Sequence, residues 1–234
     1  MEFDIRLELV ERIAIVTIDN PPVNALHPAV AEGIAARIRE IENTPDIRAV
    51  ILTGAGRHFM AGGDIEFFKT LDRTRAERYV LGIQRMQDGL ATLEQPVIAA
   101  LNGSTLGGGC ELAMACDIRI AEEHVKLAQP EVKLGLIPGA GGTQALPRLV
   151  PTGIAKRMLF TGEYIGAAEG LRIGLVDEVV ATGTALTRAI ELGRAIAANA
   201  PLAVSAVKRA VNLGLQMSLL DANRVEATLF ASLA

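Results

Sequence analysis

Residues 102–117 read NGSTLGGGCELAMACD, and they follow a short apolar run, VIAAL, at 97–101. An apolar run of this length predicts a buried strand, and three consecutive glycines allow the backbone to turn sharply where the strand ends. The apolar residues that come next predict a helix that begins near Gly108 and covers 111–115. N–H groups at the start of a helix carry the positive end of its dipole, so this turn suits a bound oxyanion.

The order of strand, glycine turn and helix recurs along the chain, which predicts an α/β fold with a helical C-terminal third. Apolar runs predict strands at 3–9, 13–18, 49–53, 97–101, 118–121, 125–128 and 175–180, and glycine-rich loops are expected at 54–63, 102–109 and 137–143. Apolar residues at helical spacing predict helices at 28–43, 73–93, 142–149, 152–160, 166–171, 184–198, 201–216 and 218–232, with one helical turn at 130–134.

Composition narrows the possible partners. The 234 residues carry a net charge of −4, with 3% aromatic residues and no tryptophan. Such a chain lacks the basic surface and the stacking platforms that nucleic acids bind, so no nucleic-acid partner is expected. The longest uncharged run, 96–110, is too short and too broken for a membrane span, and the opening MEFDIRLELVER is no signal peptide. We therefore expect a soluble cytoplasmic protein with no membrane partner.

Motifs of several other enzyme classes are incomplete. GAGRHF at 54–59 and LGGGCE at 106–111 lack the third glycine of a dinucleotide-binding GxGxxG, and neither contains the GK[ST] of a phosphate-binding loop. Ser104 is not part of a GxSxG, and the three histidines are isolated, so neither a serine nucleophile nor a metal site is predicted. Cys110 and Cys116 are interpreted as small buried side chains.

Two glutamates are candidates for acid–base chemistry. Glu111 lies in the first turn of the helix that follows the glycines, where a carboxylate is also a common partner for the helix dipole. Its neighbours are apolar, however, and a buried carboxylate usually has a function. Glu131 follows a proline, before the loop IPGAGGT at 137–143. Taken alone, Glu131 could equally be an ordinary solvated residue.

Three strings together resemble the crotonase superfamily, the enoyl-CoA hydratase/isomerase family: HFMAGGDI (58–65), AALNGSTLGGGCELAMACDIRIA (99–121) and AQPEVKLGLIPGAGGTQALPRLV (128–150). PPVNAL (21–26) and LFTGEYIGAAEGLRIGLVDEVV (159–180) also fit, and the resemblance covers roughly residues 5 to 232. It implies a crotonase-like ββα spiral core over 1–200 and a C-terminal helical region over 201–234 that mediates oligomerisation. It also implies a further helical stretch after 229–234, on which the outer coenzyme A contacts and the assembly would depend.

The resemblance assigns roles to specific residues. It implies that the backbone N–H groups of Gly63 and Gly108 bind the oxygen of an acyl-CoA thioester. Glu111 and Glu131 would then move a proton and a water molecule, with Glu131 exchanging the proton at C2. The N–H of Gly139 would hold the water.

The resemblance also implies contacts to coenzyme A as part of the substrate, with no permanently bound cofactor. The predicted contact residues are Ala25, Ala61, Gly63, Asp64, Ile65 and Gly108. Basic residues that could meet the phosphates, or simply form a solvated face, are Arg57, Lys69, Arg73 and Lys156.

The predicted activity is enoyl-CoA hydration, the addition of water to a 2-enoyl-CoA in fatty-acid or related acyl-CoA metabolism, by a homotrimer or hexamer. Isomerisation of 3-enoyl-CoA, or another acyl-CoA lyase reaction, is the competing hypothesis within the family. Outside catalysis, the chain could be a binding protein, for instance an RNA-binding relative, and it could also be a subunit of a larger fatty-acid oxidation complex. The pair of glutamates favours hydration, because one acid–base group is enough for isomerisation.

Overall fold

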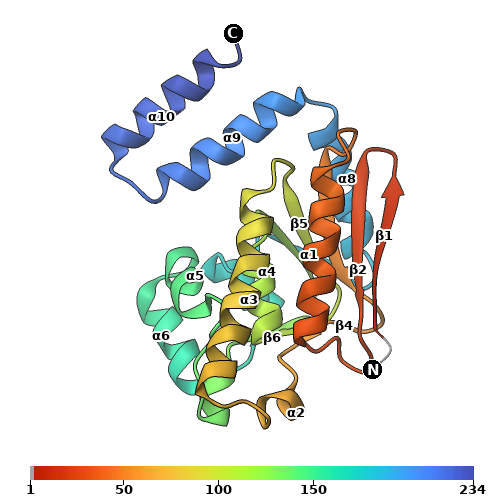
Figure 1. Cartoon of the computed structure of the whole chain (residues 1–234), viewed down its shortest axis with the longest axis vertical. Helices are drawn as coiled ribbons and strands as arrows, with labels where there is room; N and C mark the ends of the chain where they lie inside the picture. The colour runs from red at the N-terminus through yellow and green to blue at the C-terminus, as the bar shows by residue number, and fades with distance from the viewer. Residues whose placement is uncertain (1–2) are drawn as a thin grey trace.

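The computed structural model describes residues 3–234, and a six-stranded sheet forms its centre (Figure 1). The strand order is β1-β2-β3-β5-β7-β10. The strands are β1 (Asp4–Val10), β2 (Ile13–Asp19), β3 (Ala49–Gly54), β5 (Val97–Leu101), β7 (Ile118–Glu122) and β10 (Glu178–Val180). β1 pairs with β2 in antiparallel fashion, and every later pair is parallel. This arrangement confirms the predicted α/β class.

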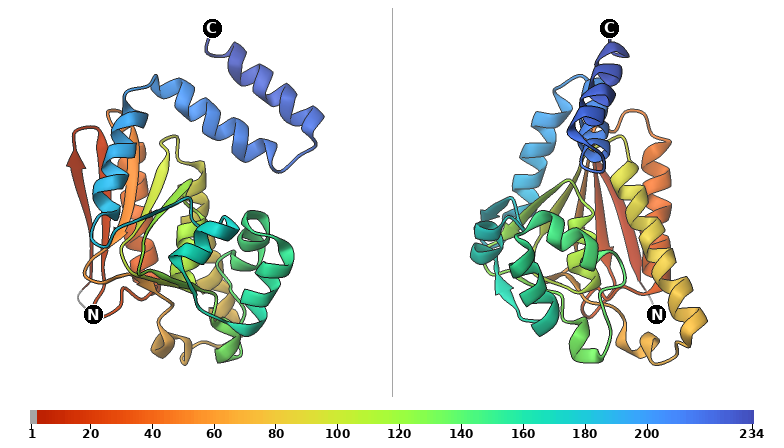
Figure 2. Two further views of the ribbon diagram at one scale, coloured as in Figure 1. Left: turned by 180° about the vertical axis from the view of Figure 1, so that it is seen from behind. Right: turned by 90° about the vertical axis from the view of Figure 1, so that its left-hand side faces the viewer.

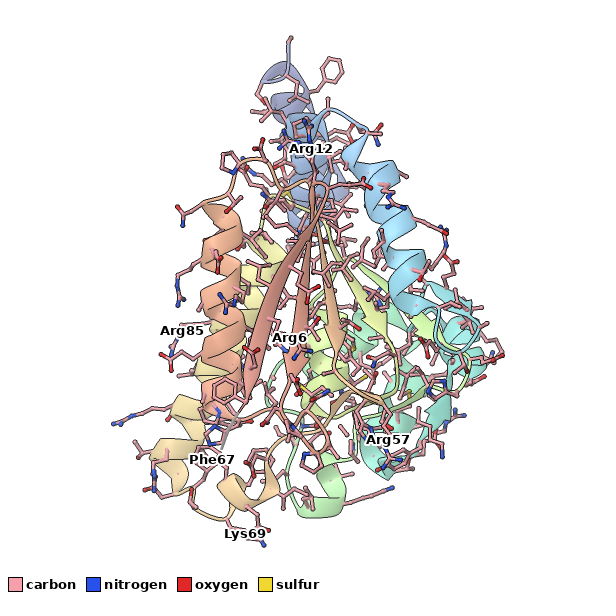
Figure 3. All side chains as sticks on the ribbon, turned by 90° about the vertical axis from the view of Figure 1, so that its right-hand side faces the viewer. Arg6, Arg12, Arg57, Phe67, Lys69 and Arg85 are labelled. Atoms are coloured by element: carbon pink, nitrogen blue, oxygen red, sulfur yellow. The ribbon has the colours of Figure 1, made fainter. Side chains whose placement is uncertain are left out.

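Helices cover both faces of this sheet. α8 (Ala185–Ala197) lies on one face, and α1 (Pro28–Glu42) and α3 (Arg73–Thr92) lie on the other (Figures 2 and 3). β2 shows the resulting alternation, because Ile13 and Ile15 pack under α8 whereas Val16 and Ile18 belong to the larger core beneath α1. β3 and β5 are buried along their whole length, as expected of strands covered on both sides.

A second sheet carries the glycine-rich segments, and here the sequence-based prediction is incomplete. Its strand order is β4-β6-β8-β9, with strands β4 (His58–Ala61), β6 (Ser104–Leu106), β8 (Lys126–Ala128) and β9 (Ile165–Gly166). β4 and β6 lie inside the segments 54–63 and 102–109, for which the sequence predicts loops. Each has four residues or fewer and is paired with a strand far away in the chain. Neither is long enough to show the alternation of apolar and polar residues that identifies a strand.

The helices elsewhere follow the predicted pattern closely. They are α4 (Gly108–Met114), the 3-10 helix η1 (Glu131–Leu134), α5 (Gly142–Leu149), α6 (Thr152–Thr161), α7 (Ala167–Ile173), α9 (Pro201–Gly214) and α10 (Leu219–Ala231). The short helix α2 (Ile65–Phe68) and strand β9 were not predicted, and β10 begins three residues later than expected. No helix within residues 3–234 combines the length and the apolar content needed to cross a bilayer.

The last two helices, α9 and α10, lie side by side at the end of the molecule farthest from α2 (Figure 1). The buried Lys208 of α9 joins this pair to the core. Its Nζ lies 2.8 Å from Asp117 Oδ2 and donates to the carbonyl oxygens of Leu90 and Gln95 at 3.1 and 3.0 Å. A buried ammonium group needs partners of this kind, so Lys208 fixes where α9 meets the core.

Candidate active site

A cavity of about 540 Å³ is lined by residues of α2 and η1. Helix α2 lies at the end of the molecule away from α9 and α10 (Figure 1). The other walls of the cavity come from the ends of β4 and β6, the start of α4, the first half of α3, and the loop at 136–140. Eight residues that the sequence singled out line it: Ala61, Gly63, Ile65, Arg73, Gly108, Glu111, Glu131 and Gly139. The cavity therefore collects residues from segments that are far apart in the chain.

Gly63 presents its N–H on the side away from its neighbouring strand. It forms an isolated parallel bridge with Leu26, in which Leu26 N donates to Gly62 O at 2.8 Å and Asp64 N donates to Leu26 O at 3.3 Å. In a parallel bridge of this kind the central residue uses neither its own N–H nor its own carbonyl toward the partner. The N–H of Gly63 therefore takes no part in the backbone hydrogen bonds of this bridge.

Gly108 is the first residue of α4, so its N–H has no partner within the helix. The turn before it needs glycine, because Gly107 has a φ of 51° and a ψ of −123°. Hydrogen bonds hold this turn in place, since Gly107 N donates to Ala128 O at 2.9 Å and Gly107 O accepts from Glu111 N. A second backbone N–H therefore lies free at the cavity wall.

Glu111 lies one turn into α4, and only 5% of its surface is exposed. Its Oε1 accepts a hydrogen bond from Gly142 N at 2.8 Å, which ties α4 to the start of α5. Burial raises the pKa of Glu111 to about 7, although the bond from Gly142 opposes the change, and the nearby charge of Glu131 raises it further. A group with this pKa can hold or release a proton near neutral pH.

Glu131 reaches the same cavity from η1. A methyl group built on Gly107 would lie 2.7 Å from Glu131 Oε1, so this carboxylate lies directly against the glycine turn. Its other oxygen, Oε2, is buried and has no hydrogen-bond partner within the described chain. Burial is also the main cause of the raised pKa of Glu131. A buried oxygen without a partner is costly, which points to a group that interacts with something entering the cavity.

The remaining wall is apolar and is supplied mainly by α3 and the loop opposite to it. Val80 packs against Gly139, and Gln84 Nε2 donates to Gly139 O at 2.7 Å. Tyr79 faces the cavity, and its hydroxyl donates to Leu26 O at 3.0 Å. The other apolar side chains of this wall are Leu71, Ala76, Ile83, Leu136 and Ile137. Such a wall suits a hydrocarbon chain.

Other predicted contact residues lie outside the cavity lining. The carbonyl of Ala25 accepts a hydrogen bond from Asn20 Nδ2, and the carboxylate of Asp64 caps α2 by accepting from Phe67 N at 3.0 Å. Of the four basic candidates, only Arg73 lines the cavity. Figure 3 shows Lys69 at the edge of the molecule, where it pairs with Glu66. Arg57 and Lys156 do not reach the cavity lining either.

The sequence did not indicate two polar residues at the rim. Lys133 and Tyr164 both line the cavity, and Lys133 Nζ lies 5.1 Å from the centre of the Tyr164 ring. Lys133 comes two residues after Glu131, and this proximity was the available signal. Among the described residues, no three His, Cys, Asp or Glu side chains come close enough together to hold a metal ion.

Comparison with known proteins adds independent information. The family model for enoyl-CoA hydratase/isomerase matches residues 8–234. A short-chain-enoyl-CoA hydratase from Clostridium acetobutylicum is 45% identical over 226 residues, covering 96% of this chain and 87% of that protein. A crotonyl-CoA hydratase from Syntrophomonas wolfei is 41% identical over 229 residues, covering 97% and 88%.

The solved structures agree with this similarity in sequence. The crystal structure of an enoyl-CoA hydratase from Bacillus anthracis superposes with a TM-score of 0.94 at 37% identity, and it covers 97% of this chain and 89% of that one. A match over nearly the whole chain, at this identity and with the same fold, leaves one conclusion. The chain belongs to the enoyl-CoA hydratase/isomerase family, the crotonase superfamily, as the resemblance of its glycine and glutamate motifs predicted.

Proposed function

We propose that this protein is an enoyl-CoA hydratase, which adds water across the C2–C3 double bond of a 2-enoyl-CoA to give a 3-hydroxyacyl-CoA. The observation that carries the proposal is the meeting of the buried carboxylate of Glu111 and the half-buried carboxylate of Glu131 with two free glycine N–H groups at one cavity. The hydratases among its relatives support the same activity.

The two N–H groups supply the electrostatic part of the mechanism. The thioester oxygen accepts hydrogen bonds from Gly63 N and Gly108 N, and it gains negative charge when water adds at C3. Gly108 begins α4, so its N–H also carries the positive end of the helix dipole. Stabilisation of the developing enolate by one such donor is worth about 10²–10³ in rate.

The two carboxylates carry out the proton transfers. In the proposed mechanism a water molecule binds between Glu111 and Glu131, and the N–H of Gly139 helps to hold it. One carboxylate takes a proton from the water as its oxygen bonds to C3, and the other, protonated, gives a proton to C2. The product has gained one water molecule. A proton exchange between the two carboxylates then restores the protonation state in which each of them began. We assign the C2 proton to Glu131, and the raised pKa values of both groups fit this sharing of one proton.

Isomerisation is the competing reaction within the family. Moving a double bond from C3 to C2 requires one group that removes a proton and returns it at another carbon. A second carboxylate close to the first would then have no function and would only raise the cost of ionising its neighbour. The arrangement of Glu111 and Glu131 therefore favours hydration.

We further propose that coenzyme A enters only as part of the substrate and that the enzyme works as a trimer or a dimer of trimers in the cytoplasm. Ala61 and Ile65 line the cavity close to Gly63, where the thiol arm would pass. Arg73 and Lys133 place positive charge at the cavity for the phosphates. Exposed apolar side chains on α9 and α10 support an assembly through these helices.

Calorimetry tests the substrate class directly. A saturated acyl-CoA thioester should bind, whereas its free acid should not, because the free acid lacks both the thioester oxygen and the coenzyme arm. The matched control is coenzyme A alone, which keeps the arm but lacks the acyl group. Equal affinity for the thioester and the free acid would contradict the proposal.

A further inference from the structure

Tyr79 makes a hydrogen bond that the proposed chemistry does not use. Its hydroxyl, on α3, donates to the carbonyl oxygen of Leu26 at 3.0 Å, although the two residues are 53 positions apart. The same oxygen accepts a longer bond, of 3.3 Å, from Asp64 N. The bond from Asp64 N is longer than most N–H···O hydrogen bonds in proteins. At 3.0 Å, the hydroxyl of Tyr79 is therefore the closer of the two groups that donate to this carbonyl.

Leu26 contacts both of the glycines whose N–H groups face the cavity. Its backbone forms the bridge with Gly63, through the bonds to Gly62 and Asp64. Its side chain is 1% exposed, and Cδ2 lies 2.9 Å from the position that a methyl group on Gly108 would take. Leu26 therefore contacts the segments of both Gly63 and Gly108, through its backbone on one side and its side chain on the other.

The ring of Tyr79 is held in place by its own neighbours. The ring centres of Phe67 and Phe68 lie 5.4 and 5.6 Å away, and Phe68 also packs against Gly63. Burial raises the pKa of Tyr79 above its usual range, and the charges of Glu111 and Asp64 raise it further. The hydroxyl is therefore held in its protonated, donating form near neutral pH.

We infer that Tyr79 is a positioning residue for the oxyanion hole: its hydroxyl fixes Leu26, and through Leu26 it sets the separation of the Gly63 and Gly108 N–H groups. The inference rests on the proposed function of those two glycines. Tyr79 needs no contact with the reacting atoms to act in this way. Its effect should show in how strongly the site polarises a thioester carbonyl, which a merely structural role would leave unchanged.

The test is Tyr79→Phe, which removes the hydroxyl and keeps the ring between Phe67 and Phe68. The probe is a saturated four-carbon acyl-CoA labelled with ¹³C at the thioester carbonyl, since it cannot be hydrated and remains bound during an infrared measurement. Binding to the wild type should lower the carbonyl stretching frequency relative to solution. In Tyr79→Phe the frequency should return part of the way to the solution value.

Kinetics provide the second readout. The kcat for hydration of the corresponding 2-enoyl-CoA should fall about 10-fold, less than the 10²–10³ expected from losing a whole oxyanion donor. KM should change by less than about threefold, because an interaction that strengthens only in the transition state affects kcat. An unchanged unfolding temperature would show that the fold has survived the loss of one hydroxyl.

Thr53→Val is the matched control, because it removes a buried hydroxyl that donates to the carbonyl oxygen of Ala100 at 2.9 Å, outside the cavity lining. It should leave the carbonyl frequency at the wild-type value. A wild-type frequency in Tyr79→Phe, or equal shifts in both variants, would overturn the inference. If the wild type itself failed to shift the frequency, the proposed oxyanion hole would be wrong instead.

Discussion

At the residue scale, Glu111 combines a chemical role with an energetic cost. Its carboxyl group is almost fully buried, and the one hydrogen bond from Gly142 N compensates only part of the lost hydration. The folded protein therefore favours the protonated form, which is the form needed when this pair of carboxylates shares a proton. The same burial makes the charged form a source of instability.

The pH dependence of stability follows from this preference. The pKa of Glu111 is raised from 4.5 to about 7 in the folded state. The folded protein thus keeps a proton that the unfolded chain releases between these two values, so the contribution of Glu111 to stability is most favourable below pH 4.5 and falls as the pH rises through 7. A difference of this size corresponds to about 3 kcal/mol.

We expect Glu111→Gln to remove this loss, because an amide stays neutral. Its free energy of unfolding should exceed that of the wild type by up to about 3 kcal/mol above the folded-state pKa. The two proteins should differ little below the unfolded-state pKa. Urea unfolding at both ends of this range measures the difference. The control is Glu8→Gln, at an exposed position of β1. A wild type that is the more stable protein at the alkaline end would contradict this link between burial and stability.

The sequence revealed the residues of the site unevenly. Glu111 could be identified from its apolar neighbours, but the pairing of Gly63 with Gly108 required the family resemblance, since no local pattern brings two distant N–H groups together. For Tyr79 the sequence indicates only a place on the apolar face of its helix. Its hydroxyl acts on Leu26, 53 positions away, and helical spacing carries no information about such a partner.

At the element scale, the start of α4 packs so closely against β4 that no side chain fits between them. A methyl group on Gly109 would overlap the backbone carbonyl of Met60, and a backbone atom cannot move aside as a flexible side chain can. Close contact between this helix and β4 is thus a requirement of the glycine-rich sequence. It also positions the N–H of Gly108, one residue earlier.

Gly109→Ala should therefore destabilise the protein by about 1–3 kcal/mol or more, as overpacking does, and should lower hydration because α4 must shift. Gly153→Ala is the control, since a methyl group there meets no atom within 4 Å in α6. That change should be neutral or stabilising by up to about 1 kcal/mol. Thermal unfolding and hydration assays compare the two variants. Equal behaviour of both variants would show that the packing of α4 on β4 is unimportant.

Helices and strands are predicted well wherever their apolar residues recur at a regular spacing. The long helices and the central strands follow from apolar spacing, whereas β4 and β6 lie in predicted loops because three or four residues between glycines show no alternation. The helix α2 has four residues and is defined by the cap from Asp64 and by packing of Phe68 on Gly63, and neither feature is local enough to predict.

At the scale of the whole molecule, α9 and α10 expose more apolar surface than a monomer usually does. Exposed side chains on this pair include Leu202, Val207, Val211, Leu215, Leu219, Leu220 and Phe230. Leu215 is 83% exposed and Phe230 is 77% exposed. Exposed apolar side chains gathered on two neighbouring helices favour the proposed assembly through this pair.

Light scattering should give the mass of a trimer or of a dimer of trimers at micromolar concentration. Glu in place of Leu215 and Phe230 together should reduce the mass, because each change would bury a charge in the interface. Arg85→Glu, at an exposed position of α3 outside this helix pair, is the control for a change of charge alone. A wild-type monomer would contradict the proposed assembly.

The central claim is that Glu111 and Glu131 work together on one water molecule, and the loss of absorbance as a conjugated 2-enoyl-CoA is hydrated measures it most directly. Glu111→Gln and Glu131→Gln should each slow hydration by about 10²–10⁴, the usual worth of a positioned acid or base. The double variant should be little worse than the slower single one, because groups acting as a unit are not additive. Thioester binding should persist, since Gly63 and Gly108 are unchanged.

The claim would be contradicted if Glu111→Gln hydrated the substrate at a rate within about threefold of the wild type, because that loss is too small for the removal of an acid or base. Wild-type turnover of 3-enoyl-CoA that is faster than hydration would contradict it as well.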